Sequence, residues 1–181
     1  NLHLDIRGRY GFIADYQALE IWVSKDFEGI NGSSDPDGDR AKVKKMVEEG
    51  MPGWVKLPFT DVNKDQFFGY DFEMNDYLSN LSIAFHWKPN DPTKTQRTFW
   101  INGKISLEMA GTEPSVMTLT DLGFKSLMMN EEVDAYKKNA GNGSIRFDNA
   151  VNAGEICYQG CSGNVLSYAI DGWVFTSPRP L

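Results

Sequence analysis

The sequence predicts an all-β domain, and three observations support this fold class. Apolar and polar residues alternate with a period of two along several short segments. Clusters of Gly, Pro, Asn and Asp separate these segments, as expected for strands joined by turns. The aromatic content of 13% is also high, and aromatic residues favour strands. Together these features indicate a β-sandwich or a β-barrel.

The clearest alternation lies in residues 18–24 and 81–87. In the first segment Leu19, Ile21 and Val23 point to one side, and Glu20, Trp22 and Ser24 point to the other. In the second segment Leu81, Ile83, Phe85 and Trp87 form the apolar side. Further strands are predicted at residues 2–6, 53–57, 98–109, 143–147 and 165–176. Asn102-Gly103 fits either a tight hairpin turn or a bulge within one longer strand.

Two short helices are predicted as insertions in loops of this β-domain. Residues 39–49 place apolar side chains at helical spacing, with Asp39 as N-cap and Gly50 just past the end. Residues 130–138 begin with acidic and end with basic residues, which suits the helix dipole. We find no repeat or linker, so residues 1–181 are predicted to form a single domain.

The net charge of −7 makes nucleic-acid binding unfavourable, because the phosphate backbone repels an acidic surface. No apolar segment approaches the roughly 18 residues that a membrane-spanning helix needs. The acidic surface favours a monomer in solution. The chain opens on Asn1 and enters a strand-like segment at once, so we interpret it as a trimmed or mature fragment.

The two cysteines, Cys157 and Cys161, are separated by three residues that include a glycine. This spacing allows a small disulfide, and it equally allows two free thiols, because the loop geometry decides between them. It does not match the two-residue spacing of thioredoxin-like redox motifs.

The order of five segments resembles the choice-of-anchor, or cleaved-adhesin-like, jelly rolls. Residues 18–29 resemble the strand VSTDFxG of these domains, and residues 53–57 resemble their WxxL strand. Residues 81–87, 96–102 and 172–178 resemble LYIAFRY, QRTWxIDN and GWxxSKP, in the same order. The order is also similar to that in a domain of unknown function found in surface lipoproteins of Bacteroidetes.

This resemblance implies a jelly-roll-like β-sandwich with the two short helices as insertions. It also implies an exported protein at the cell surface, in the outer membrane or periplasm, lipid-anchored through a segment absent from this chain. It implies a role in glycan capture or adhesion, and it does not imply a reaction. Where the related domains carry Ile-Asp-Asp or Ile-Asp-Asn, this chain has Asn102 in place of the first acid, which argues against a metal role there.

The sequence offers no catalytic motif. It contains no Gly-rich phosphate loop, no HExxH and no GxSxG. His3 and His86 alternate out of strands without an obvious nucleophile beside them. We therefore predict that the protein is not an enzyme and assign no catalytic residue, although paired carboxylates of a glycosidase leave no signature in sequence.

The predicted ligand-binding residues are Trp22, Trp100, His86 and Glu20. A sugar ring packs on an aromatic side chain, and neighbouring polar groups fix its hydroxyls. If their strands are neighbours, these four residues share one face and form a glycan platform. The alternative is that the same residues lie under a loop or helix.

A metal site is predicted with lower specificity at Asp35, Asp37 and Asp39. Acids at alternate positions before a glycine resemble half of a calcium loop, but the EF-hand positions for Gly and Glu are not matched. The same segment is also typical of a turn and of the start of a helix. Any bound calcium is expected to be structural, and no other cofactor is predicted.

The sequence therefore predicts a non-catalytic glycan-binding or adhesion module whose partner is a glycan or another surface protein. The alternative is a structural or protein-interaction domain of a larger surface lipoprotein, and a glycoside-active enzyme ranks third.

Overall fold

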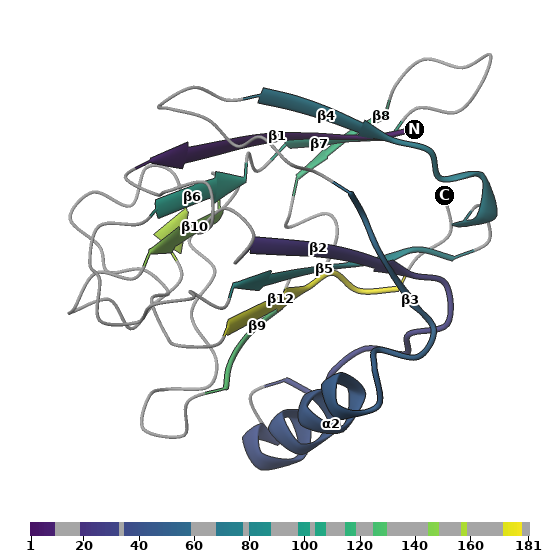
Figure 1. Cartoon of the computed structure of the whole chain (residues 1–181), viewed down its shortest axis with the longest axis vertical. Helices are drawn as coiled ribbons and strands as arrows, with labels where there is room; N and C mark the ends of the chain where they lie inside the picture. Colours follow the sequence, from purple (N-terminus) through teal and green to yellow (C-terminus); the bar gives the residue numbers. More distant parts are fainter. Residues whose placement is uncertain are drawn as a thin grey trace.

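Two antiparallel sheets and one helix make up the described part of the chain. The computed structural model describes residues 1–9, 19–32, 35–58, 68–77, 80–87, 98–101, 104–107, 115–118, 125–129, 145–148, 157–158 and 172–178. The two sheets lie one above the other, and the helix covers the lower sheet on the side away from the upper one (Figure 1). This confirms a β-rich fold with two sheets.

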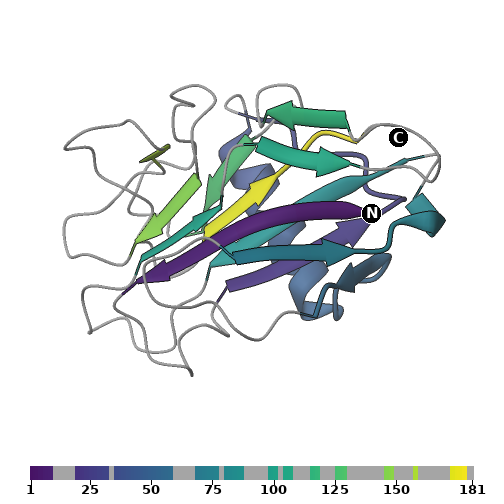
Figure 2. The ribbon, with the colours of Figure 1, turned by 90° about the horizontal axis from the view of Figure 1, so that it is seen from above.

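The upper sheet has seven described strands in the order β11-β10-β6-β1-β7-β8, with β4 also paired to β1. Figure 2 shows this sheet from above, with β1 and β4 side by side. The strands are β1 (Leu2–Arg9), β4 (Phe68–Phe72), β6 (Thr98–Ile101), β7 (Lys104–Leu107), β8 (Ser115–Thr118), β10 (Ile145–Asp148) and β11 (Cys157–Tyr158).

The lower sheet has five described strands in the order β3-β2-β5-β12-β9. They are β2 (Leu19–Ser24), β3 (Trp54–Lys56), β5 (Ser82–Trp87), β9 (Lys125–Met128) and β12 (Gly172–Phe175). A short 3₁₀ helix, η1 (Asn75–Tyr77), follows β4.

Asn102-Gly103 does not join the arms of a hairpin, because β6 and β7 both pair antiparallel with the same edge of β1. Ile6 pairs with Ile101, whereas His3 pairs with Ser106, so three steps along β1 correspond to five steps along its neighbour. The predicted long strand over 98–109 is therefore two strand segments with a two-residue offset in register.

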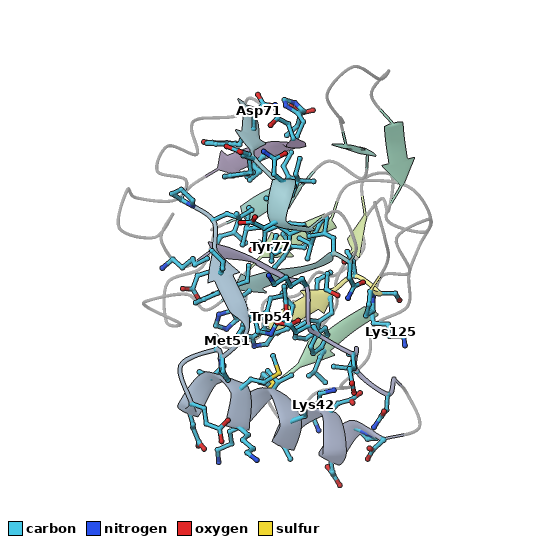
Figure 3. The ribbon with its side chains drawn as sticks, turned by 90° about the vertical axis from the view of Figure 1, so that its right-hand side faces the viewer. Lys42, Met51, Trp54, Asp71, Tyr77 and Lys125 are labelled. Carbon is cyan, nitrogen blue, oxygen red and sulfur yellow. The ribbon has the colours of Figure 1, made fainter. Side chains whose placement is uncertain are left out.

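The alternation predicted for residues 18–24 is confirmed in β2, whereas residues 82–86 of β5 are buried on both faces. Leu19, Ile21 and Val23 are buried and lie opposite Trp87, Phe85 and Ile83 in the register of the two strands. Leu2, Leu4 and Ile6 of β1 are fully buried, whereas His3 and Asp5 are partly exposed on its other side. Figure 3 places Asp71 on the outer side of the upper sheet and Trp54 between the lower sheet and the helix.

The helix α2 (Pro36–Glu48) begins earlier than the sequence predicts. Asp35, not Asp39, is the N-cap, and its side chain accepts from the Gly38 N–H. Pro36 occupies the first helical position, where its missing N–H carries no penalty. Asp39 lies inside the first turn and is buried.

Gly50 lies just past the end of the helix, as predicted, although the last helical residue is Glu48 instead of Glu49. Gly50 adopts a φ of 81°, its N–H bonds to Val47 and the following Met51 N–H bonds to Met46. This pair of hydrogen bonds is a Schellman motif, which a glycine in the left-handed region completes. The second predicted helix, residues 130–138, lies outside the described residues.

Four described strands were not predicted: β4, β8, β9 and β11. The C-terminal segment predicted over 165–176 is described only from residue 172, where β12 begins. The jelly-roll connectivity and the single-domain organisation stay predictions.

Candidate functional site

Three of the four residues predicted to bind a ligand share one face of the lower sheet. Glu20 pairs with His86, and Trp22 pairs with Ala84, in the register of β2 and β5. Because alternate residues of a strand share a face, Glu20, Trp22 and His86 all lie opposite to Ile21 and Phe85. This face is the one that the helix α2 covers (Figure 3).

Trp100 does not belong to this face. It lies in β6 of the upper sheet, where it pairs with Arg7 on one side and Arg146 on the other. The four-residue platform is therefore wrong as predicted, because the phase of a strand does not tell which sheet the strand enters.

Glu20 is the centre of a small polar network. Its carboxylate accepts from His86 Nδ1 at 2.8 Å and lies 3.2 Å from Lys56 Nζ on the neighbouring strand β3. The hydrogen bond from His86 lowers the pKa of Glu20 below its ordinary value of 4.5; burial opposes this shift, and Lys56 supports it. Glu20 is thus ionised at neutral pH and ties together β2, β3 and β5.

His86 is buried, whereas its alternation predicted an exposed position. Its side chain is 7% exposed, and its ring stacks on Trp173 with centroids 3.9 Å apart and an interplanar angle of 8°. Trp173 in turn stacks on Phe175, at 5.4 Å and 5°. Because the stacked ring is shielded, this imidazole is poorly placed to exchange a proton with a substrate.

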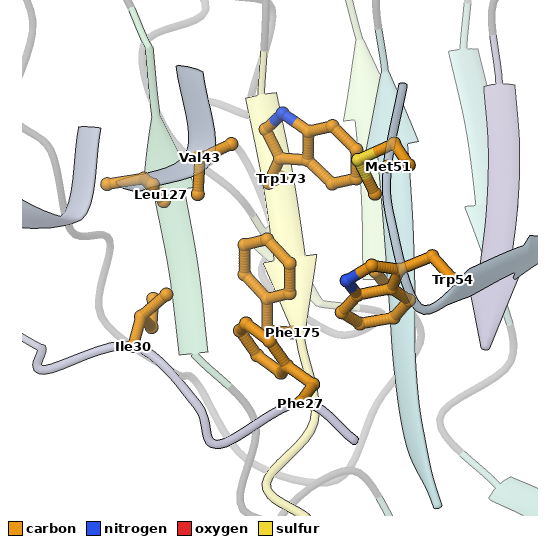
Figure 4. Close-up of a cluster of buried hydrophobic side chains, with 9 residues drawn as sticks. Phe27, Ile30, Val43, Met51, Trp54, Leu127, Trp173 and Phe175 are labelled. Carbon is orange, nitrogen blue, oxygen red and sulfur yellow. The ribbon is translucent and has the colours of Figure 1, made fainter. Parts of the chain in front are cut away.

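A hydrophobic cluster fills the space between this face and α2 (Figure 4). Phe27 contacts both Trp54 and Phe175, with ring centroids 4.9 and 5.2 Å apart. Val43 of the helix and Leu127 of β9 are fully buried in the same cluster. The other buried members are Ile30, Met51, Ala84 and Trp173. Most aromatic rings of this face therefore serve as core.

Trp22 lies at the margin of the cluster and is partly buried against it. The Lys56 ammonium lies 6.0 Å from its ring centroid, within reach of a cation–π interaction. Its indole nitrogen is buried without a hydrogen-bond partner among the described residues. Trp22, Glu20 and Lys56, here called the Trp22 corner, are the ligand-capable groups that keep some exposure.

The predicted metal ligands have other partners. Asp39 accepts from the Asn31 and Gly32 N–H groups at 2.8 and 2.9 Å, so its carboxylate holds the loop before α2. Asp35 accepts from Gly38 and from the Asn31 side chain, while Asp37 is exposed. Within the described ranges, no three His, Cys, Asp or Glu side chains are grouped to hold a metal ion. The calcium site stays a prediction.

Sequence reasoning missed a second polar cluster, on the outer face of the upper sheet. His3 of β1 lies between two carboxylates, with Nδ1 2.8 Å from Asp71 and Nε2 3.0 Å from Asp5. The alternation of β1 places His3 and Asp5 on one face, which the sequence shows. Asp71 belongs to β4, which was not predicted.

Two further predictions concern the cysteines and membrane-spanning segments. Cys157 lies in β11, but Cys161 is outside the described residues, so the pairing of the cysteines stays open. None of the described helices combines the length and the apolar character required to cross a bilayer.

Comparison with protein-family models, with curated proteins and with solved structures finds no match to this chain. The function is therefore argued from the site alone.

Proposed function

We infer that this chain is a non-catalytic, jelly-roll-like β-sandwich that serves as a structural or protein-interaction domain of a larger protein. The observation that carries this inference is the stacked series His86, Trp173 and Phe175, buried beneath α2. His86, one of the residues predicted to form a sugar platform, is instead buried in this stack. The place of the domain in an exported, lipid-anchored cell-surface protein rests on the sequence resemblance.

The non-catalytic part of this inference rests on the Glu20–His86 pair. Such a pair resembles the oriented base of a catalytic triad, in which a carboxylate holds an imidazole. Here the imidazole is stacked on Trp173 and only 7% exposed, so it offers little surface to a substrate. The pair is better suited to cross-linking neighbouring strands.

A glycan-binding module is the second candidate, and the Trp22 corner favours it. A partly exposed indole beside a carboxylate and an ammonium offers one stacking surface and two hydrogen-bonding groups. This site is smaller than the platform predicted from sequence, because Trp100 lies in the other sheet.

A glycan-array screen of the wild type and Trp22→Ala separates the two candidates. Val55→Ala is the matched control, since Val55 is 54% exposed on the adjacent strand β3. For a structural domain we expect no glycan whose binding depends on Trp22, together with lower stability of Trp22→Ala in urea. A specific glycan that binds the wild type and Val55→Ala but not folded Trp22→Ala would overturn the structural role and establish a binding module.

A further inference from the structure

The His3 cluster has a geometry that only a charged histidine satisfies. Both ring nitrogens lie within hydrogen-bond distance of a carboxylate oxygen, at 2.8 and 3.0 Å. A neutral imidazole carries one N–H and one lone pair, so one nitrogen would direct its lone pair at a carboxylate. The imidazolium donates from both nitrogens and removes this repulsion.

The cluster also connects two strands. Asp5 lies two residues from His3 on β1, whereas Asp71 lies opposite His3 on β4. β4 pairs with β1 alone, so within the described part of the chain β4 is an edge of the upper sheet. The His3–Asp71 contact is therefore a side-chain link between this edge strand and the rest of the sheet.

Gly69 of β4 makes room for the ring. A Cβ atom built on Gly69 would lie 2.6 Å from His3 Cε1, closer than two carbon atoms pack. The absence of a side chain at this position allows the imidazole to lie across the two strands and reach Asp71.

We propose that His3 is a pH-sensitive latch: as an imidazolium it fastens the edge strand β4 to β1, and its deprotonation loosens that edge. The direction of this pH dependence follows from the two carboxylates beside His3. The hydrogen bond to Asp71 raises the pKa of His3 above 6.5; partial burial opposes this, and Asp5 adds to the rise. The latch is fully engaged below 6.5, the pKa of the unfolded chain, and is lost as pH rises through the folded pKa.

Other charged residues lie nearby in the chain, among them Arg7 of β1, two residues after Asp5. Glu73 of the chain segment after β4 is exposed, and the amino group of Asn1 lies two residues before His3. On the third strand, Ser106 of β7 pairs with His3, and Lys104 lies two residues from Ser106. Among the described side chains, Asp5 and Asp71 are those that contact the ring.

The test combines ring ¹⁵N spectra of His3 with amide hydrogen exchange of β4, in the full 181-residue chain, at pH values on both sides of 6.5. We expect both ring nitrogens to remain protonated at pH values somewhat above 6.5, because the folded pKa of His3 is raised. As His3 deprotonates, the protection of β4 amides, corrected for intrinsic exchange, should fall about two- to fivefold, as is typical of partly exposed ion pairs. The amides of β5 serve as the internal reference.

Two variants and a control make the result specific. Asp71→Asn removes the partner charge, and Gly69→Ala displaces the ring without changing any charge; both should lower the pKa of His3 and flatten the pH dependence of β4. Glu73→Gln makes the same charge change two residues from Asp71 and should behave as wild type. Three results would overturn the proposal: a pKa of His3 at or below 6.5, a hydrogen-exchange protection of β4 that does not change with pH, or the same pH dependence of that protection in Asp71→Asn and Glu73→Gln.

Discussion

At the scale of single residues, Asp35 and Asp39 act as hydrogen-bond acceptors for the loop before α2 and for its first turn. Asp39 is fully buried and accepts two backbone N–H groups, and Asp35 caps α2. An unpaired buried carboxylate would be strongly unfavourable, so these hydrogen bonds are what makes the burial of Asp39 possible. The alternating acids that resemble a calcium loop thus have a local explanation.

Replacing Asp39 should therefore destabilise the fold. Asp39→Asn leaves one acceptor oxygen and turns an amide N–H₂ towards the second backbone N–H, so we expect a loss of about 1.5–3 kcal/mol, the range for hydrogen bonds to charged groups. Urea unfolding measures this loss. Asp37→Asn, on an exposed position of the same helix, is the control and should change stability by less than about 0.5 kcal/mol. Equal effects of the two variants would contradict the assigned role of Asp39.

The environment of Glu20 predicts that the free energy of unfolding falls in acid. Its pKa is lower in the folded chain than the ordinary value of 4.5, mainly because of the hydrogen bond from His86. The stabilisation is therefore present above pH 4.5 and is lost as pH falls through the folded pKa.

Unfolding of wild type and Glu20→Gln across this range checks the prediction. The wild type should be the more stable protein near neutral pH, and the difference should shrink in acid. Glu48→Gln, on the exposed end of α2, should give no such pH-dependent difference. A difference between wild type and Glu20→Gln that is constant over pH would refute the role of the ionised carboxylate.

At the scale of secondary-structure elements, α2 is the cover of the lower sheet. One pair of valines shows which side of the helix matters: Val43 is fully buried, whereas Val47, one turn later, is 46% exposed. Val43→Ala removes two methyl groups from the cluster of Figure 4 and should cost about 1.5–3 kcal/mol, including the cavity term.

Val47→Ala is the matched substitution, with the same chemistry on the same helix. It should leave the free energy of unfolding nearly unchanged, and alanine's higher helix propensity acts in its favour. Chemical denaturation of both variants compares them directly. Comparable losses would mean that α2 does not pack on the sheet through Val43.

The strength of the local pattern decided which elements could be predicted. The clean alternation of residues 18–24 and 81–87 predicted both β2 and β5, and it gave the correct buried side for β2. In contrast, β4 contains Gly69 and β11 has only two residues, so neither carries a period that can be recognised. The start of α2 was misplaced because Asp35 and Asp39 both satisfy the N-cap preference, and only the hydrogen bonds distinguish them.

At the scale of the whole molecule, the sites depend on which strands become neighbours, and no local pattern contains this information. The phases of Trp22 and Trp100 were read in the same way, yet the two residues lie in different sheets. Likewise, His86 was placed on the correct face, but it is covered by Trp173, which lies far along the chain. The sequence thus determines the side of each strand more readily than what covers that side.

The position of β12 between β5 and β9 has a consequence for how the chain is made. Phe85 pairs with Val174, and Thr176 bonds to Ile83 through both its backbone and its hydroxyl, so the middle of the lower sheet joins residues distant in sequence. During synthesis β2, β5 and α2 therefore emerge from the ribosome before β12. Until β12 follows, the cluster beneath α2 lacks Trp173 and Phe175. Folding of this sheet waits for residues 172–176 to emerge, and a chain that stops at Asp171 should show no cooperative thermal unfolding.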